Sequence, residues 1–314
     1  SSVCRSEKSA VRSSFQALVS NVSARALRVG PAASAVSESD NPPGRLISTT
    51  GPLLTVQRFT GAHELGHAVM GHKPSLDSEG IIARSPFVAG TNLDKQELAA
   101  NAFASELLMP QWLVVAHMKR QKWTRNHLTQ PEMVYQLSLR LGASYAATCH
   151  ALVRFGTLSA QAHTKLLGVP VKSIKQKVAG PVIPETWHSD FWHITDQDDG
   201  LTIEASVRDV LVFDLPEHSS GGYKWQLDQM EGAGLETTED WRDAPQGSMI
   251  GSSVARHITV RARERGRGRV RLAERRPWLP AEDPLRIVEV ACAVKAPIEQ
   301  GLSESERQRI LDAA

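Results

Sequence analysis

Two histidines and a glutamate in the segment "FTGAHELGHAVMGHK", residues 59–73, have the spacing of a metal-binding helix. Residues four apart lie on one face of an α-helix, one turn above each other, so His63 and His67 can direct both imidazoles at one ion. Imidazole is a ligand well suited to zinc. Glu64 lies about 100° around the helix from His63, close enough to reach a water molecule beside the ion without binding the ion. This HExxH pattern predicts a hydrolytic zinc centre.

The competing interpretation is a buried helix whose two histidines are satisfied by hydrogen bonds alone. Leu65, Ala68 and Val69 suggest that the rest of the helix is buried, which would also keep bulk water away from a metal centre. A catalytic zinc ion needs a third protein ligand and an open fourth position. The metal interpretation therefore depends on one more ligand elsewhere in the chain.

The next predicted helix, "DKQELAANAFASELLM" at residues 94–109, offers two acids, Glu97 and Glu106. They are nine residues apart, or about 2.5 turns, so they face opposite sides and cannot both be ligands. We expect Glu97 to be the third ligand and assign no chemistry to Glu106. Asn101 lies one turn beyond Glu97 and is expected to hydrogen-bond the second ring nitrogen of a ligand histidine.

These residues predict the mechanism of a zinc peptidase. The ion would polarise the scissile carbonyl and acidify its water, while Glu64 would take the proton of that water and pass it to the leaving amine. His72, nine residues from His63, is expected to face away from the ion. The chain contains no G-x-S-x-G elbow, phosphate loop or dinucleotide fingerprint that would offer a rival catalytic set.

The segment "RFTGAHELGHAVMGH" followed by "ELAANAFASELLMP" closely resembles the ImmA/IrrE metallopeptidases, over roughly residues 40–170. The resemblance implies that His63, His67 and Glu97 bind zinc and that Glu64 is the catalytic acid. It also implies a gluzincin-like fold, with helices around a small sheet. Members of this family cut intracellular proteins, commonly helix-turn-helix repressors of phage, mobile elements and stress responses.

The middle of the chain, residues 111–180, is basic and carries Glu132 as its one acid. The segment "VYQLSLRLGASYAATCHALVRFG" has the pattern of a helix-turn-helix, with Gly142 in the turn and Ser144 as N-cap. DNA binding is one interpretation of this pattern. A solvated basic face, or a docking surface for an acidic substrate, is the interpretation that we prefer, because helix-turn-helix is first of all a packing unit.

From about Gly180 the pattern changes to short alternating segments broken by turn clusters such as "SSGG" and "RGRG". This spacing predicts an all-β sandwich after an α-rich first half. The segments predicted as strands are "LTIEA", "DVLVFDL", "YKWQL", "HITVRA", "RVRLA" and "RIVEVACAV". Cys292 alternates with valines in the last of them and is expected to lie in the core.

Three segments of this half, "PEHSSGGYKW", "MIGSSVARHITVRA" and "ERRPWLP", resemble the inhibitory loops of chagasin-like cysteine-protease inhibitors, which have an immunoglobulin-like fold. The resemblance covers about residues 195–295. It departs from the family at "HSSG", residues 218–221, and at "GSSV", residues 251–254. The loop residues that it marks for protein binding are Gly222, Tyr223, Trp225, Gly251, Arg276, Pro277 and Trp278. They indicate either protein recognition on an inherited fold or inhibition of papain-like proteases; the alternative is that Trp225 and Trp278 are packing aromatics.

The bulk composition fits a cytoplasmic location. The chain has 314 residues and a formal charge of +2, so as a whole it is not an electrostatic nucleic-acid binder. Its three cysteines (Cys4, Cys149 and Cys292) are far apart, which suits a reducing compartment better than a disulfide scaffold. No run of 18 apolar residues exists, so no membrane-spanning helix is expected.

Together these patterns predict an α+β multidomain protein. The expected parts are an N-terminal helix and linker at 1–45, a mostly helical zinc-peptidase domain with the helix-turn-helix-like segment at 46–180, the sandwich at 185–297, and a tail at 298–314. The expected function is a zinc-dependent endopeptidase with a C-terminal recognition or inhibitor domain. The alternative function is a non-catalytic regulator that binds DNA through its basic helices or inhibits cysteine proteases, with the zinc site structural or idle.

Overall fold

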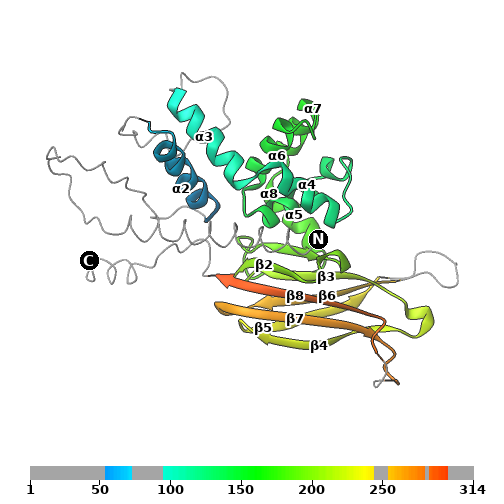
Figure 1. The fold of residues 1–314 in the computed structure, drawn as a ribbon. Helices are drawn as coiled ribbons and strands as arrows, with labels where there is room; N and C mark the ends of the chain where they lie inside the picture. The colour runs from blue at the N-terminus through cyan, green and yellow to red at the C-terminus, as the bar shows by residue number, and fades with distance from the viewer. Residues whose placement is uncertain (1–53, 73–94, 244–253, 280–282, 296–314) are drawn as a thin grey trace, which may run out of the picture. The chain divides into compact units, whose positions relative to one another are not determined.

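The computed structural model describes residues 54–72, 95–243, 254–279 and 283–295 (Figure 1). The chain forms two compact units: unit 1 runs to Pro110, and unit 2 comprises Gln111–Ile298. The helix and linker expected at 1–45 and the tail expected at 298–314 lie outside the described residues.

Unit 1 contains two packed helices, α2 (Leu54–Val69) and α3 (Lys95–Leu108). Ala100 and Ala104 of α3 are fully buried. A Cβ atom added at Gly66 of α2 would lie 3.0 Å from the ring of Phe103, so the glycine allows the two helices to approach closely. The described part of unit 1 is helical, and the small sheet expected for this domain is not among the described residues.

One stretch of the described residues, Lys95–Arg120, could cross a membrane as judged by length and composition. The structure divides this stretch into α3 and α4 (Gln111–Arg120), which are interrupted at Pro110. The 14 residues of α3 span about 21 Å, less than the hydrocarbon core of about 30 Å. With the break at Pro110, neither α3 nor α4 is long enough by itself to cross the hydrocarbon core.

The helices of unit 2 after α4 are α5 (Pro131–Leu141), α6 (Tyr145–Arg154), α7 (Ala160–Leu167) and α8 (Val171–Ala179), with a short 3-10 turn at His127–Thr129. The predicted helix-turn-helix is confirmed in α5 and α6. Gly142 ends α5 in the left-handed region at φ 64°. The Ser144 hydroxyl accepts a hydrogen bond from the Ala147 amide at 3.2 Å and caps α6.

The predicted β-sandwich is also confirmed and consists of two four-stranded sheets. Its strands are β1 (Phe191–Ile194), β2 (Leu201–Ser206), β3 (Val210–Glu217), β4 (Lys224–Gly232), β5 (Leu235–Arg242), β6 (Val254–Ala262), β7 (Gly266–Arg275) and β8 (Arg286–Lys295). Sheet A has the order β1-β3-β6-β5, and sheet B has the order β2-β8-β7-β4. The β1–β3 and β2–β8 pairs are parallel, and the other pairs are antiparallel. Trp192, Phe213, Trp225 and Cys292 lie in the core between the sheets.

A buried ion pair joins the helices to the sandwich. Arg140 of α5 lies 3.0 Å from Asp198, and the side chains are 3% and 0% exposed. Gln121 donates to the same carboxylate at 2.6 Å, and the Thr195 amide donates at 2.9 Å. Arg140 also donates to the His193 carbonyl of β1 at 2.9 Å.

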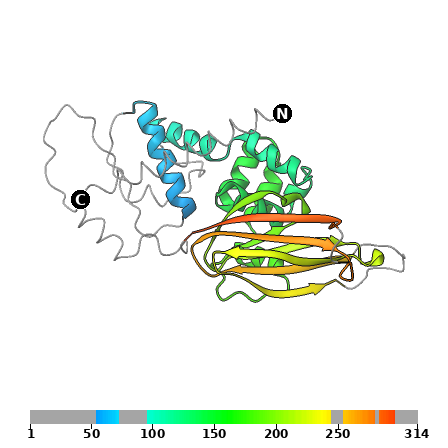
Figure 2. The same ribbon diagram turned by 60° about the horizontal axis from the view of Figure 1, so that its bottom comes forward.

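Further polar contacts at this junction involve β1 and the segment before it. The Gln136 side chain donates to the Phe191 carbonyl at 2.7 Å and accepts from the His193 amide at 2.8 Å. The Lys175 ammonium of α8 lies 3.0 Å from Asp190 and donates to the Ser189 carbonyl at 2.9 Å. Both views show α4–α8 gathered on one side of the sandwich (Figures 1 and 2).

These contacts join α4–α8 to the sandwich in one compact unit. The change from helix to strand falls near Gly180, as the pattern predicts. The compact units divide at Pro110 instead, and α4–α8 belong to the same unit as the sandwich. The physical reason is the buried polar network around Arg140, Gln136 and Lys175, which a sequence pattern does not show.

One carboxylate of this region makes stability depend on pH. Asp209, between β2 and β3, is 3% exposed and accepts hydrogen bonds from the amides of Asp190 at 2.8 Å and Ser206 at 2.7 Å. Burial, and then the negative charge of Asp190, raise the pKa of Asp209 from 3.8 to about 7. The folded state therefore holds this proton more tightly than the unfolded chain does, and the resulting stabilisation is lost as pH rises from about 4 to about 7.

We expect Asp209→Asn to remove this pH dependence, because an amide does not titrate. The stability advantage of the wild type over the variant should shrink steadily between pH 4 and pH 7. Urea unfolding at half-unit pH intervals measures it. A difference that stays constant over this range would show that the carboxylate is already ionised at pH 4.

Candidate functional site

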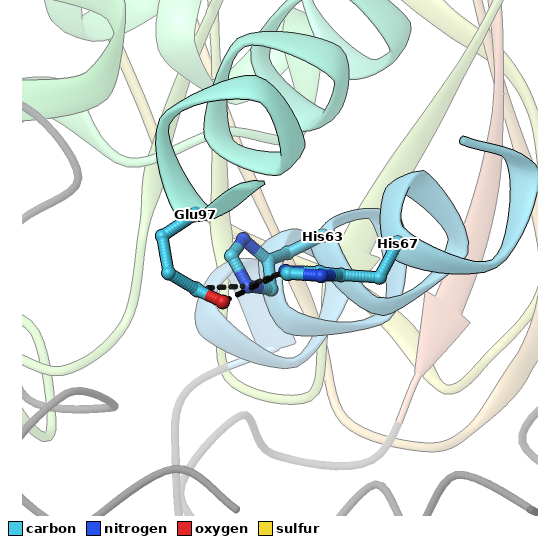
Figure 3. Close-up of side chains that lie close together, drawn as sticks. All are labelled: His63, His67 and Glu97. Carbon is cyan, nitrogen blue, oxygen red and sulfur yellow. Dashed lines mark hydrogen bonds and ion pairs between the residues drawn. The ribbon is translucent and has the colours of Figure 1, made fainter. Parts of the chain in front are cut away.

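Three potential metal ligands meet between the two helices of unit 1 (Figure 3). The Nε2 atoms of His63 and His67 lie 3.0 Å apart. The Glu97 carboxylate places Oε2 at 3.1 Å from His63 Nε2 and Oε1 at 3.2 Å from His67 Nε2. In the described part of the chain, His63, His67 and Glu97 each offer one ligand atom, and these three atoms all lie within 4.8 Å of one another.

The local structure explains how the ligands converge. His63 and His67 are one turn apart on α2, so their rings lie on the same face. Glu97 is in the first turn of α3 and is 7% exposed. Glu106, on the same helix, is exposed, in keeping with the opposite face expected from helix geometry.

The donor set fits a small divalent cation. Two ring nitrogens 3.0 Å apart can share only one proton, and the third group is a carboxylate, which accepts hydrogen bonds but cannot donate when ionised. Glu97 Oε2 is buried without a hydrogen-bond partner in the described part of the chain. Ligands of tetrahedral zinc lie about 3.3 Å from one another, close to the separations found here.

Asn101 completes the contacts of His63. Its Oδ1 atom lies 2.9 Å from His63 Nδ1. Since an amide oxygen can only accept, the proton of a neutral His63 is placed on Nδ1 and the lone pair is left on Nε2. The structure thus places Asn101 against the second ring nitrogen of His63, as the sequence interpretation expects.

His72 does not face away from the site, and that prediction is wrong. Its Nδ1 atom lies 3.1 Å from Nδ1 of His67, and the two rings meet edge-on at 81°. The prediction counted residues as if the helix continued, but α2 ends at Val69 and Gly71 takes the left-handed conformation at φ 65°. The His72 amide then donates to the His67 carbonyl at 3.1 Å.

The burial expected around the histidines holds only in part. Ala62 and Gly66 are buried, and Glu64 is half-buried next to His63. Ala68 is exposed and Val69 is 64% exposed, contrary to the expectation of a buried helix. The C-terminal end of α2, next to the site, is therefore exposed at Ala68 and Val69.

A second group of predicted residues forms a surface at one end of the sandwich. The Arg276 guanidinium lies 4.6 Å from the centre of the Tyr223 ring, and its Nε atom donates to the Gly221 carbonyl at 3.3 Å. Gly222 has φ 79°, and a Cβ atom there would lie 2.3 Å from the Trp278 ring. Trp278 is 63% exposed. We call Gly222, Tyr223, Arg276, Pro277 and Trp278 the loop surface.

Trp225 does not belong to the loop surface, so the prediction that it binds a partner is wrong. It is 2% exposed and lies in the core between the sheets. Its indole nitrogen donates to the Pro216 carbonyl at 3.1 Å, and Arg286 stacks over its ring. β4 begins at Lys224, so Tyr223 lies in the turn before the strand, whereas Trp225 is on the inward-facing side of the strand. Gly251 lies outside the described residues.

Two fully buried acids beneath the loop surface were missed in the sequence. Glu274 accepts from the His218 amide at 2.6 Å and from Arg286 at 2.8 Å. Glu217 accepts from the Trp225 amide at 2.9 Å. Both acids continue an inward-facing alternation, after Leu215 in β3 and Leu272 in β7, and that pattern could have identified them.

Both resemblances seen in the sequence are confirmed by comparison with family models. Residues 53–153 match Peptidase_M78, the IrrE N-terminal-like domain. Residues 204–291 match the chagasin family peptidase inhibitor I42. The chain thus contains an IrrE-like domain followed by a chagasin-family domain.

Individual relatives match the second domain. Amoebiasin-2 of Entamoeba histolytica is 23% identical over 103 residues, which cover 32% of this chain and 84% of the relative. The crystal structure of the cysteine protease inhibitor EhICP2 from Entamoeba histolytica is 23% identical and covers 34% of this chain and 98% of that one, with a TM-score of 0.32. PbICP-C, solved in complex with falcipain-2, is 14% identical and covers 34% of this chain and 90% of that one, with a TM-score of 0.25.

Proposed function

We propose that this chain is a zinc-dependent endopeptidase that cuts cytoplasmic protein substrates, with helix-turn-helix repressors as the first class to test. The observation that carries the proposal is the convergence of His63, His67 and the buried Glu97 carboxylate on one point. The match of residues 53–153 to the IrrE N-terminal-like domain supports it.

The roles of the residues follow from their positions. His63, His67 and Glu97 would hold a divalent ion, which would supply a Lewis acid to polarise a peptide carbonyl. Asn101 holds the His63 ring through its Nδ1 proton. Glu64 follows His63 on α2, and as a general base it takes a proton from the attacking water and delivers it to the leaving amine.

The proposal is tested by metal content and by substrate identification together. The purified full chain should carry one zinc ion, counted by elemental analysis after removal of loosely bound metal. Proteomic comparison of cells that express wild type or Glu64→Gln should reveal protein termini that only the wild type produces. A chain that carries no zinc, or identical termini in both cultures, would contradict the proposal.

A second function, inhibition of papain-like cysteine proteases, is favoured by the loop surface. Trp278 lies against Gly222, and Arg276 stacks on Tyr223, so the surface presents an exposed aromatic ring beside a cation. Such residues anchor protein interfaces. The chagasin-family match supports this function, whereas the departures "HSSG" and "GSSV" weaken it relative to recognition of another protein.

We expect Gly222→Ala to weaken inhibition of papain about 30-fold or more, because the added methyl group must displace Trp278. That loss corresponds to an interface anchor of at least about 2 kcal/mol. The full chain with Glu64→Gln is titrated against papain with a fluorogenic substrate. Gly200→Ala is the matched control: Gly200 also has a positive φ, 71°, but a Cβ atom there meets nothing within 4 Å. Equal inhibition by both variants would count against the loop surface as the contact site.

The DNA-binding alternative receives less support. Arg154 is the only lysine or arginine of α6, the helix that would enter the groove. Arg140 and Lys175 are buried in ion pairs with the acids Asp198 and Asp190, so they are not available to phosphates. Electrophoretic mobility at low salt would detect binding if the remaining basic residues suffice.

A further inference from the structure

The histidine after the end of α2 has a specific relation to one metal ligand. His72 Nδ1 lies 3.1 Å from His67 Nδ1, and the ring centres are 4.9 Å apart with the planes at 81°. An edge-on arrangement of this kind suits an N–H of one ring directed at a nitrogen lone pair of the other. Neither the HExxH pattern nor helix geometry predicts that His72 contacts His67.

The hydrogen positions follow from the ligand atom. His67 Nε2 is the atom that faces His63 and Glu97, at 3.0 and 3.2 Å. A ring nitrogen binds a cation through its lone pair, so Nε2 must carry no proton. A neutral imidazole then carries its proton on Nδ1, and this N–H is directed at His72. His72 must accept it through its own Nδ1 lone pair.

We infer that His72 is a positioning residue that accepts a hydrogen bond from Nδ1 of His67 and holds that ring in the tautomer and orientation needed to bind the metal. The inference rests on the proposed function, since it concerns the same site. It gives each ligand histidine one acceptor: the Asn101 amide oxygen for His63, and the His72 ring nitrogen for His67.

The chain positions His72 through its backbone. The left-handed conformation of Gly71 reverses the chain after α2, and the His72 amide donates to the His67 carbonyl at 3.1 Å. The residue is therefore tied to His67 twice, once through the backbone and once through the rings. Metal-ligand histidines usually donate their second nitrogen to a carboxylate, a carbonyl or water, and removal of such a partner lowers metal affinity about 10- to 100-fold.

The test separates the acceptor atom from the bulk of the ring. His72→Phe keeps an aromatic ring but has no acceptor, and His72→Asn offers an amide oxygen near the position of Nδ1. Zinc affinity of the full chain is measured by competition with a chromogenic chelator. We expect the phenylalanine variant to bind zinc about 10- to 100-fold more weakly and the asparagine variant to recover most of that loss.

His163→Phe serves as the matched control, because it removes a histidine pair elsewhere: His163 Nε2 lies 3.0 Å from His150 Nδ1, between α7 and α6. Its zinc affinity should equal that of the wild type. If the wild type binds zinc and His72→Phe binds it with equal affinity, the inference is overturned but the proposed function is not. Equal losses in His72→Phe and His72→Asn overturn the acceptor role. A wild type that binds no zinc overturns the proposed function and this inference together.

Discussion

Substitution of Glu64 by glutamine is expected to lower the rate of substrate cleavage about 10²- to 10⁴-fold and to leave the zinc content unchanged. General acid–base catalysis contributes a factor of this size. Glutamine has the shape of glutamate but cannot take a proton from water at neutral pH. The zinc content should persist because Glu64 is not one of the three proposed ligands, His63, His67 and Glu97.

Initial rates on a substrate identified by the proteomic comparison measure the effect, with zinc counted in the same preparations. Glu106→Gln is the matched control, since it removes an exposed acid from α3 and should not change the rate. Full activity of Glu64→Gln, with zinc bound, would mean that another group accepts the proton.

Replacement of Arg140 by methionine is expected to lower the free energy of unfolding of unit 2 by about 3–5 kcal/mol. The change leaves the Asp198 carboxylate, 0% exposed, without its cationic partner. Gln121 and the Thr195 amide still donate to it, but neither neutralises its charge. An uncompensated buried charge is far more destabilising than the loss of a pair at the surface.

Urea unfolding of the full chain measures the loss, followed by a probe in unit 2. The double variant Arg140→Met/Asp198→Leu should recover much of the stability, because both charges are then absent. Lys177→Met is the surface control: Lys177 pairs with Glu132 at 2.8 Å but is 72% exposed, so a change of at most about 1 kcal/mol is expected. A similar small change for Arg140→Met would show that water reaches Asp198.

The sequence predicts elements well where the signals are local. The break at Pro110, the turn at Gly142 and the cap at Ser144 each depend on one or two neighbouring residues. Six of the eight strands coincide with the alternating segments. In the site, the four-residue spacing of His63 and His67 predicts that their rings lie together, and the nine-residue spacing of the two acids shows that only one of them can join the rings.

The missed features depend on contacts between distant segments or on a change of backbone direction. β1 has only four residues, and β5 forms the edge of sheet A with polar residues on both faces, so neither shows clear alternation. His72 escapes helix arithmetic because Gly71 ends the regular repeat. In the sequence, Arg140 is one of many basic residues. Its pairing with Asp198, 58 positions later, is visible only in the structure.

The contact between α5 and β1 has a consequence for the evolution of this chain. The Gln136 amide occupies hydrogen-bonding groups of β1, and Val210 and Val212 of sheet A lie in one cluster with Ala179 of α8. If a gene rearrangement copied the sandwich without α4–α8, the apolar cluster at Val210 and Val212 would be uncovered and Asp198 would lack its counter-ion. We therefore expect substitutions at Arg140 and Asp198 to be inherited together in this chain, although residues 53–153 and 204–291 match two separate families.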